Sequence, residues 1–397
     1  MRVLKPTRAT VVGGSIGGLT AALLLHDLGC DVEVYERSGS ALDARGAGIA
    51  VLDATVRYFV DRGITDPAEI CSSTQSIRYL WPDGSVRYEA GHHYRFSSWN
   101  TIYRALLACF DDDRYHLGRE MVSFRTRGDE VEVGFADGDT RRCDLLVCAD
   151  GINSLGRESL YPGTSPVYSG YVAYRGTVPE RDLSPATFAG LRDAITYQVI
   201  PDSHILVYPI PGPDGEVEPG HRLMNFVWYR NVADGAPLDR LLAGRDGTPR
   251  RVSLPPGAMA DEAIDEMRAL ADRALAPPIA EVVTTVAEPF AQAVFDIEVP
   301  GMAADQVAIL GDAAFAVRPH AAAGTAKAAD DAWQLAEQLA AWSHDVPEAL
   351  RSWEQTQLAL GRDLLQRCRD IGERSQFRNS WDPGDPALIF GLYGPGN

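Results

Sequence analysis

The stretch "ATVVGGSIGGLTAALLLHDLGCDVEVYER", residues 9–37, decides the fold. Its pattern predicts a buried strand, a glycine-rich turn, a helix and a second strand that ends in an acidic residue. The dinucleotide-binding fingerprint G-x-G-x-x-G has Gly13 and Gly18 at its first and third glycine positions, and Ser15 stands at the second. The first glycine permits a tight turn, and the third lets the helix pack closely against the strand. The stretch therefore predicts a Rossmann-like unit that binds a dinucleotide.

Two polar residues of this stretch indicate which dinucleotide binds. Ser15 is small, its hydroxyl can donate to a phosphate oxygen, and the N–H groups that begin the next helix attract the same anion. Glu36 ends the second strand, where a carboxylate accepts from ribose hydroxyls and disfavours a 2′-phosphate. We therefore expect the adenosine of FAD or NAD. Arg37, the next residue, either contacts this nucleotide or is exposed to solvent. For the whole stretch, the alternative is a glycine-rich turn that binds no ligand.

The composition excludes several classes of protein. The 397 residues, 45% hydrophobic and 23% charged, are typical of a globular chain of two or three domains. The net charge of −18 disfavours nucleic acid and anionic membrane surfaces as partners. No apolar run approaches the ~18–20 residues of a membrane helix. The first strand follows the N-terminus directly, and the cysteines and histidines lack ligand spacing, so we expect a cytoplasmic protein with no signal peptide and no metal site.

The patterns after residue 37 predict an inserted second domain. "IRYLWPDGSVRYE", residues 77–89, alternates around a Pro-Asp-Gly turn and predicts a β-hairpin, and residues 167–230 predict a mainly antiparallel sheet. The tail, residues 380–397, is rich in proline and glycine and is expected on the surface. The predicted fold class is α/β, a Rossmann-like FAD-binding domain with an inserted antiparallel substrate domain and C-terminal helices. The predicted pieces are 1–74, 98–166 and 284–345 for the FAD-binding domain, 75–97 and 167–283 for the substrate domain, and 346–397 for the C-terminal helices and tail.

Two uniformly apolar strands each end in an aspartate. Asp150 lies in "ADGINSLGR", residues 149–157, and Asp312 lies in "GDAAFAVRPHAAAG", residues 311–324. Ligands of open α/β sheets bind at the carboxyl ends of such strands, and a buried carboxylate needs a partner. A ribityl hydroxyl would serve Asp312. The small residues 321–324 let the main chain approach a flat ring, and the positive end of the following helix would stabilise a reduced flavin.

These three motifs, in this order, resemble the group A flavoprotein aromatic hydroxylases of the p-hydroxybenzoate hydroxylase architecture along nearly the whole chain. The resemblance implies FAD as cofactor and NADPH or NADH as a transient co-substrate. It also implies that O2 forms a flavin C4a-hydroperoxide, which hydroxylates an electron-rich ring. "GYVAYRGTV" (170–178), "HILVYPIPG" (204–212) and "RPHAAAGTAKAADDA" (318–332) are similar to the hydroxypyridine hydroxylases of this family. They imply a hydroxypyridine or phenol substrate, in catabolism or in pyridinol biosynthesis of the piericidin type.

The sequence departs from the family at three places. Phe315 replaces a frequent histidine, residues 319–324 replace the frequent P-x-x-G-Q-G, and Trp99 stands where an arginine is often found. These departures leave FAD binding to backbone contacts. The predicted cofactor-binding residues are Gly13, Ser15, Ile16, Gly18, Glu36, Arg37, Arg45, Gly48, Val122, Asp150, Asp312, Ala322, Ala323, Gly324, Thr325 and Ala326.

His320 is the predicted catalytic residue, because it follows Pro319 beside the expected flavin edge and a histidine pKa lies close to working pH. It would assist deprotonation of a ring hydroxyl, and a structural histidine at a helix terminus is the alternative. The predicted substrate-binding residues are Tyr197, Tyr208, Asn225, Tyr229, Pro319 and His320, with core packing as the alternative for those on strands.

Three charged residues are not assigned to the cofactor or the substrate. Arg175 holds either a substrate oxygen or a buried carboxylate, and we favour the carboxylate. Lys327 and Asp331 are four residues apart on one helix and are expected to form a surface pair. Two other functions also stay open, a flavin oxidase or reductase on the same fold and a flavin-binding regulator without turnover, as does assembly into a homo-oligomer.

Overall fold

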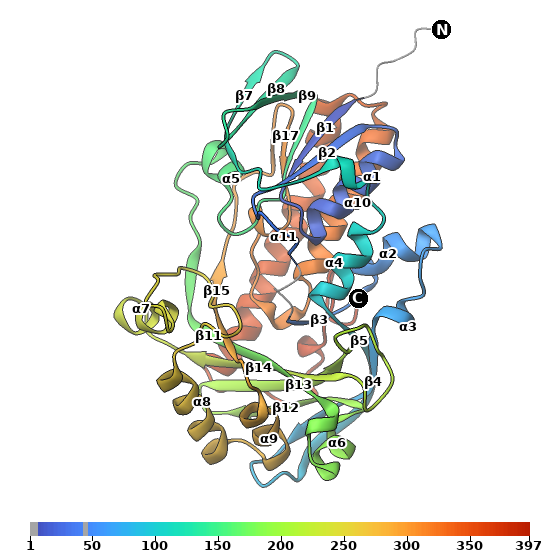
Figure 1. Cartoon of the computed structure of the whole chain (residues 1–397). Helices are drawn as coiled ribbons and strands as arrows, with labels where there is room; N and C mark the ends of the chain where they lie inside the picture. The colour runs from blue at the N-terminus through green and yellow to red at the C-terminus, as the bar shows by residue number, and fades with distance from the viewer. Residues whose placement is uncertain (1–6, 43–46) are drawn as a thin grey trace.

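The computed structural model describes residues 7–42 and 47–397. Figure 1 shows a parallel sheet with its helices at one end of the molecule and a larger antiparallel sheet at the other. The long helix α11 (Val346–Gln376) runs between these two parts. No helix in the described residues combines the length and apolar composition that crossing a membrane requires.

The first sheet is six-stranded, in the order β16-β17-β10-β1-β2-β6. Its central strand, β1, runs parallel to both neighbours, and only the short edge strand β16 is antiparallel. Helices α1 and α10 pack side by side against this sheet. This arrangement confirms the predicted Rossmann-like α/β fold. The elements are β1 (Arg8–Val12), α1 (Ile16–Asp27), β2 (Asp31–Glu36), β6 (Tyr115–Leu117), β10 (Leu145–Cys148), β16 (Ala303–Ala304), β17 (Val307–Ile309) and α10 (Gly324–Ala341).

The second sheet is eight-stranded, in the order β15-β11-β14-β13-β12-β4-β5-β3. Every neighbouring pair is antiparallel except β12 and β4, and the predicted hairpin is confirmed as β4 and β5. The strands are β3 (Gly48–Ala50), β4 (Ser72–Leu80), β5 (Val86–Ser98), β11 (Val167–Pro179), β12 (Ala194–Ile200), β13 (Ser203–Ile210), β14 (Leu223–Asn231) and β15 (Phe290–Asp296).

The edge strands of this sheet differ from the predicted domain boundaries. Strands β3 and β15 come from segments that the sequence pattern assigned to the FAD-binding domain. They join the larger sheet because β3 pairs with the end of β5 and β15 pairs with β11 along most of its length. The three residues of β3 are too few to show an alternating pattern. The division into domains therefore stays a prediction, with these two strands as exceptions.

The two faces of the eight-stranded sheet are covered by different parts of the chain. Helices α6, α8 and α9 lie on the outer face, where Phe226 and Trp228 belong to their common core. The inner face packs against α11 and the tail, whose Trp381, Leu388 and Phe390 are buried. The expectation of a surface tail is therefore wrong, because its apolar residues fill this face. The helices are α6 (Pro185–Leu191), α8 (Asp261–Ala274) and α9 (Pro277–Thr285).

The remaining elements complete the two parts of the molecule. Strands β7 to β9 form a separate three-stranded sheet beside the parallel one. All six cysteines are free thiols, and the described residues contain no cluster of three or more potential metal ligands. The elements are α2 (Asp53–Arg62), α3 (Pro67–Ile70), α4 (Trp99–Leu107), β7 (Met121–Arg127), β8 (Glu130–Phe135), β9 (Thr140–Cys143), α5 (Leu155–Leu160) and α7 (Ala236–Ala243).

Candidate active site

A cavity of about 790 Å³ lies between the two sheets. One wall is formed by Ser15, Ile16 and Gly17 at the start of α1, and another by residues 310–312, which follow β17. The remaining wall is the inner face of the eight-stranded sheet, with mainly aromatic and aliphatic side chains. Ligand pockets of ~300–1,000 Å³ are typical, so this cavity can hold a large ligand.

The glycine-rich turn after β1 is shaped by close backbone packing. Gly13 has φ +99°, and a Cβ there would lie 2.2 Å from the carbonyl oxygen of Ala149. A Cβ on Gly18 would lie 1.8 Å from the carbonyl oxygen of Gly13. The hydroxyl of Ser15, the N-cap residue of α1, makes no capping hydrogen bond. The two glycines therefore set the path of the turn, while Ser15 and the first N–H groups of α1 are left for a ligand.

Glu36 ends β2 in a fixed orientation behind this turn. Its carboxylate is buried and accepts hydrogen bonds from the backbone N–H groups of Gly14 and Ser38, both at 2.9 Å. Each oxygen has a further lone pair that a ribose hydroxyl can use. Arg37 is exposed. Val122 lies on β7 with half of its surface exposed and is not among the residues that line the cavity.

Asp150 follows β10 and keeps one acceptor atom without a partner. Its Oδ2 accepts from the N–H groups of Leu155 (2.8 Å) and Gly156 (3.2 Å), but its Oδ1 is buried and accepts from no protein group. Burial raises the pKa of Asp150, and the hydrogen bonds lower it. The neighbouring residues Ala149 and Gly151 line the cavity. The unpaired Oδ1 is compatible with a ligand near Asp150, and the role of this carboxylate stays a prediction.

Asp312 and the start of α10 form the part of the wall next to the start of α1. The Asp312 side chain is accessible from the cavity. Desolvation by the surrounding protein raises its pKa to about 6, and the positive charge of Lys327 opposes this rise. Ala322 has φ +54° and turns the chain into α10, whose N-cap, Ala323, has no side-chain cap. Ala322, Gly324 and Thr325 line the cavity, whereas Ala323 and Ala326 are buried behind them.

These features fit FAD. Two helices of 12 and 18 residues open their uncapped N-termini on the same cavity, and such ends attract anions. The tight glycine turn before α1 leaves the first N–H groups of this helix without a side-chain cap, and Glu36 and Asp312 offer acceptors to hydroxyl groups. Arg45, predicted to approach the phosphates, lies outside the described residues.

Lys327 and Asp331 correct the expectation of a surface pair. Both are buried, and Lys327 Nζ lies 2.7 Å from each carboxylate oxygen of Asp331. Asp331 also accepts from the N–H of Gly311 at 2.9 Å. The pair is buried because α10 packs against α1 and α11. The pair thus holds the turn that presents Asp312 to the cavity.

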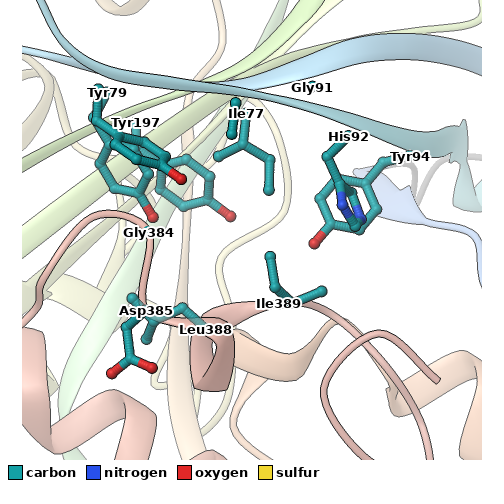
Figure 2. Close-up of a pocket in the computed structure, with 12 residues that line it drawn as sticks. Ile77, Tyr79, Gly91, His92, Tyr94, Tyr197, Gly384, Asp385, Leu388 and Ile389 are labelled. Atoms are coloured by element: carbon teal, nitrogen blue, oxygen red, sulfur yellow. The ribbon is translucent and has the colours of Figure 1, made fainter.

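The sheet wall brings some predicted substrate residues together and separates others. Tyr208 and Tyr229 line the cavity. Asn225 is buried, and its Oδ1 accepts from the N–H of Gly48 at 3.0 Å, so its carbonyl holds β3 in place. Tyr197 instead lines a separate pocket of about 70 Å³, between the β4–β5 hairpin and the tail, where Figure 2 shows it beside Tyr79.

His320 lies behind the cavity wall. Tyr171 Oη and His320 Nε2 are hydrogen-bonded at 2.7 Å, and the imidazole packs near His204 and Tyr229. His320 is 5% exposed and is not among the residues that line the cavity, although Pro319 is. Burial, then the neighbouring His204 and Arg318, lower its pKa well below 6.5. The expectation of a pKa close to working pH is therefore wrong, and the role of His320 as a base stays a prediction.

Several lining residues were missed by the sequence pattern. Phe96 and Trp99 flank the start of α4, Gln292 lies on β15 and Phe390 lies in the tail. Only their aromatic or polar character could have indicated them. Predicted site residues that do line the cavity are Ser15, Ile16, Gly48, Tyr208, Tyr229, Asp312, Pro319, Ala322, Gly324 and Thr325.

Comparisons with known proteins show the family of this chain. Residues 6–184 match the family described as "FAD binding domain", and residues 168–296 match "FAD binding domain-like". The chain is 36% identical to 2,6-dihydroxypyridine 3-monooxygenase of Paenarthrobacter nicotinovorans, over 98% of this chain and 97% of that one. The chain belongs to the FAD-dependent aromatic hydroxylases.

The comparison of folds agrees with this assignment. The solved structure of 2,6-dihydroxypyridine-3-hydroxylase from Arthrobacter nicotinovorans matches with a TM-score of 0.92 and 34% identity, over 99% of this chain and 98% of that one. 6-Hydroxynicotinate 3-monooxygenase of Pseudomonas fluorescens is 27% identical, over 97% of this chain and 94% of its own. This aromatic hydroxylase is thus an FAD-dependent monooxygenase, which confirms the predicted cofactor and enzyme class. The oxidase and regulator alternatives are not favoured.

Proposed function

We propose that this monooxygenase hydroxylates a small hydroxypyridine, with NADPH or NADH as electron donor and O2 as oxidant. The observation that carries the proposal is the continuity of the cavity. It reaches from Ser15 at the nucleotide-binding turn to Tyr208 and Tyr229 on the sheet, so a cofactor and a flat aromatic ring can share one enclosure. The relative named for 2,6-dihydroxypyridine is 36% identical, whereas a salicylate hydroxylase of Pseudomonas putida is 28% identical, and this difference supports the pyridine class over phenols.

The cofactor would be held by residues from three segments. The N–H groups at the start of α1, with Ser15, bind the pyrophosphate, and Glu36 accepts from the ribose. Asp312 accepts from the ribityl chain, and the start of α10 stabilises negative charge on the reduced ring. Bound FAD supplies the transfer of electrons from NADPH or NADH and the activation of O2. The chain's own part is to place the ring and keep water away from it.

The substrate would lie against the sheet wall. Phe96, Tyr208, Tyr229 and Phe390 give this part of the cavity aromatic faces that orient a flat ring and exclude water. Pro319 brings the loop before α10 to the same place. Asn225 acts through Gly48, and Tyr197 lies apart. We keep a cytoplasmic location, where NADPH and NADH are available, as part of this proposal.

A substrate screen tests the proposal. Purified protein loaded with FAD is mixed with a panel of hydroxypyridines and phenols, and NADH and NADPH consumption is followed under air. We expect at least one hydroxypyridine to accelerate consumption and to gain a single oxygen atom that derives from ¹⁸O2. Acceleration by phenols alone would reject the pyridine class. Product that contains no ¹⁸O would reject hydroxylation itself.

A further inference from the structure

The cavity wall contains a cation that has no carboxylate partner among the described residues. Arg175 lies on β11, where its Nη2 donates to the carbonyl oxygen of Gly48 at 2.6 Å and its Nη1 to Gln292 Oε1 at 3.4 Å. Its Nε is buried and donates to no protein group. No carboxylate in residues 7–42 and 47–397 forms an ion pair with this guanidinium. The described residues therefore do not provide the buried carboxylate that Arg175 was expected to hold.

Two buried arginines of the same chain are paired within the protein and serve as a comparison. Arg222 forms an ion pair with Glu180, and both side chains are almost completely buried. Arg157 donates from Nε, Nη1 and Nη2 to backbone carbonyl oxygens at 2.7–3.1 Å. Arg175 differs from these two, because its Nε has no acceptor and its Nη1 has only a long contact. Other arginines, such as Arg318, also leave one nitrogen unpaired, but Arg175 is the arginine among the described residues that lines the cavity. A cation in this state, accessible from a cavity, is suited to an anionic ligand.

The charge of Arg175 acts on the aromatic end of the cavity. Burial raises the pKa of Tyr208 and of Tyr229, and the positive charge of Arg175 lowers both. Both hydroxyls therefore stay protonated while the cation is close to them. Among the described lining residues, only Arg175 and Asp312 are charged, and Asp312 follows β17 on the wall where α10 begins. A negative ligand is thus favoured at the sheet wall.

We propose that Arg175 selects the substrate in its deprotonated form, by donating hydrogen bonds to the ring oxygen that has lost its proton. This inference rests on the proposed function, and it adds which ionisation state of the substrate the site binds. The guanidinium is planar, always charged and matched to oxyanions. A ring oxyanion makes the neighbouring ring carbons more electron-rich, so selection of the anion is also selection of the reactive form. Arg175 is a specificity-determining residue for this reaction.

Binding of matched probes tests the inference. The probes are 2,6-dihydroxypyridine, which can lose a proton, and 2,6-dimethoxypyridine, which cannot. Dissociation constants are measured anaerobically from the flavin absorbance of the FAD-loaded protein, for wild type, Arg175→Gln and Arg175→Lys. We expect Arg175→Gln to weaken the dihydroxy probe roughly 10- to 100-fold, as for lost charge-assisted hydrogen bonds, with little change for the dimethoxy probe. Arg175→Lys should recover part of the difference, because it keeps the charge.

A second variant separates substrate selection from support of β3. Tyr208 Oη donates to the same carbonyl oxygen of Gly48 at 2.9 Å, so Tyr208→Phe removes one contact to β3 and keeps the cation. We expect Tyr208→Phe to retain the preference for the ionisable probe, and Arg175→Gln to retain FAD with an affinity similar to that of Tyr208→Phe. Equal weakening of both probes in Arg175→Gln, together with loss of FAD, would show that Arg175 only supports the cofactor loop.

Failure of this inference differs from failure of the proposed function. If wild type binds both probes equally, or Arg175→Gln keeps the wild-type preference, the selection of the anion is disproved even where hydroxylation is observed. If wild type takes phenols instead of hydroxypyridines, resorcinol and its dimethyl ether replace the two probes, and the same comparison decides the role of Arg175.

Discussion

Lys327 and Asp331 form a buried ion pair within α10, and Asp331 also accepts the N–H of Gly311, the residue before Asp312. The pair thereby connects the inside of a helix to the wall of the active-site cavity. Because neither side chain is accessible to water, each charge depends on the other for its stabilisation. The energetic consequence can be measured directly.

Removing one partner of this pair should be costly. We expect Lys327→Met to lower the free energy of unfolding by about 3–5 kcal/mol, because Asp331 is left as an unpaired buried charge. Arg351→Met is the control, since it breaks an exposed pair with Glu348 on α11 and should cost at most about 0.5 kcal/mol. Urea unfolding followed by circular dichroism gives both values. Equal effects of the two variants would contradict the prediction.

Gly48 should not tolerate a side chain. A Cβ there would lie 2.7 Å from Asn225 Cγ and 2.9 Å from Tyr208 Cε2, so Gly48→Ala must displace β3 from the cavity wall. We expect FAD affinity to fall by about tenfold or more, the effect of a ~1.4 kcal/mol displacement. Gly39→Ala is the matched control, because a Cβ on Gly39 meets nothing within 4 Å. Fluorescence titration of apoprotein with FAD measures both, and unchanged binding by Gly48→Ala would refute the argument.

The charge at position 15 should control cofactor affinity more than the size of the residue. Ser15→Gly completes the fingerprint and is expected to change the FAD dissociation constant by no more than about threefold. Ser15→Asp places a negative charge at the start of α1, beside the expected pyrophosphate, and should weaken FAD by about tenfold or more. The difference between the two variants should shrink as salt is raised. Equal affinities for FAD would show that no phosphate lies there.

Asp312 should make the stability of the apoprotein depend on pH. Its pKa is raised from 3.8 to about 6, so the folded state holds the proton more tightly than the unfolded state. The resulting stabilisation is complete below about pH 4 and is lost as pH rises through about 6. Asp312→Asn should therefore gain about 1 kcal/mol over wild type near pH 7, a value reduced for solvent access from the cavity, and nothing near pH 4. A gain independent of pH would contradict this.

His320 should not produce a titration in the rate. Because its pKa lies well below 6.5, the imidazole stays neutral across the working range. We expect His320→Asn to lower the rate through lost packing, without changing the shape of the pH profile of kcat/KM. Disappearance of a step near pH 6.5 in this variant would show instead that His320 titrates as the sequence pattern predicted.

The parts of the site that depend on short segments could be predicted from the sequence. The turn between Gly13 and Gly18, Glu36 at the end of β2 and the loop before α10 each depend on the local geometry of one element and its neighbour. Such constraints leave a fixed residue spacing, and the spacing identified the cofactor. The orientation of Val122, which faces solvent on β7, had no comparable signal.

Contacts between distant segments could not be predicted. The spacing of Lys327 and Asp331 is the same on a buried helix as on an exposed one, and only the packing of α1 and α11 around α10 distinguishes the two cases. The hydrogen bond from Arg175 to Gly48 joins residues 127 positions apart, without a pattern in either segment. Phe390 lies in a segment without helical or strand periodicity, so its place at the cavity was hidden.

The edge strands of the eight-stranded sheet have a practical consequence for engineering. Because β3 and β15 close the two edges of this sheet, a graft of residues 167–283 from a relative would have to pair its β11 with the host's β15 and to accommodate the host's Gly48. Poor pairing between β11 and β15 would expose a strand edge, and an exposed edge invites association between molecules. A chimera intended to transfer substrate preference should therefore exchange both edge segments together with the strands between them.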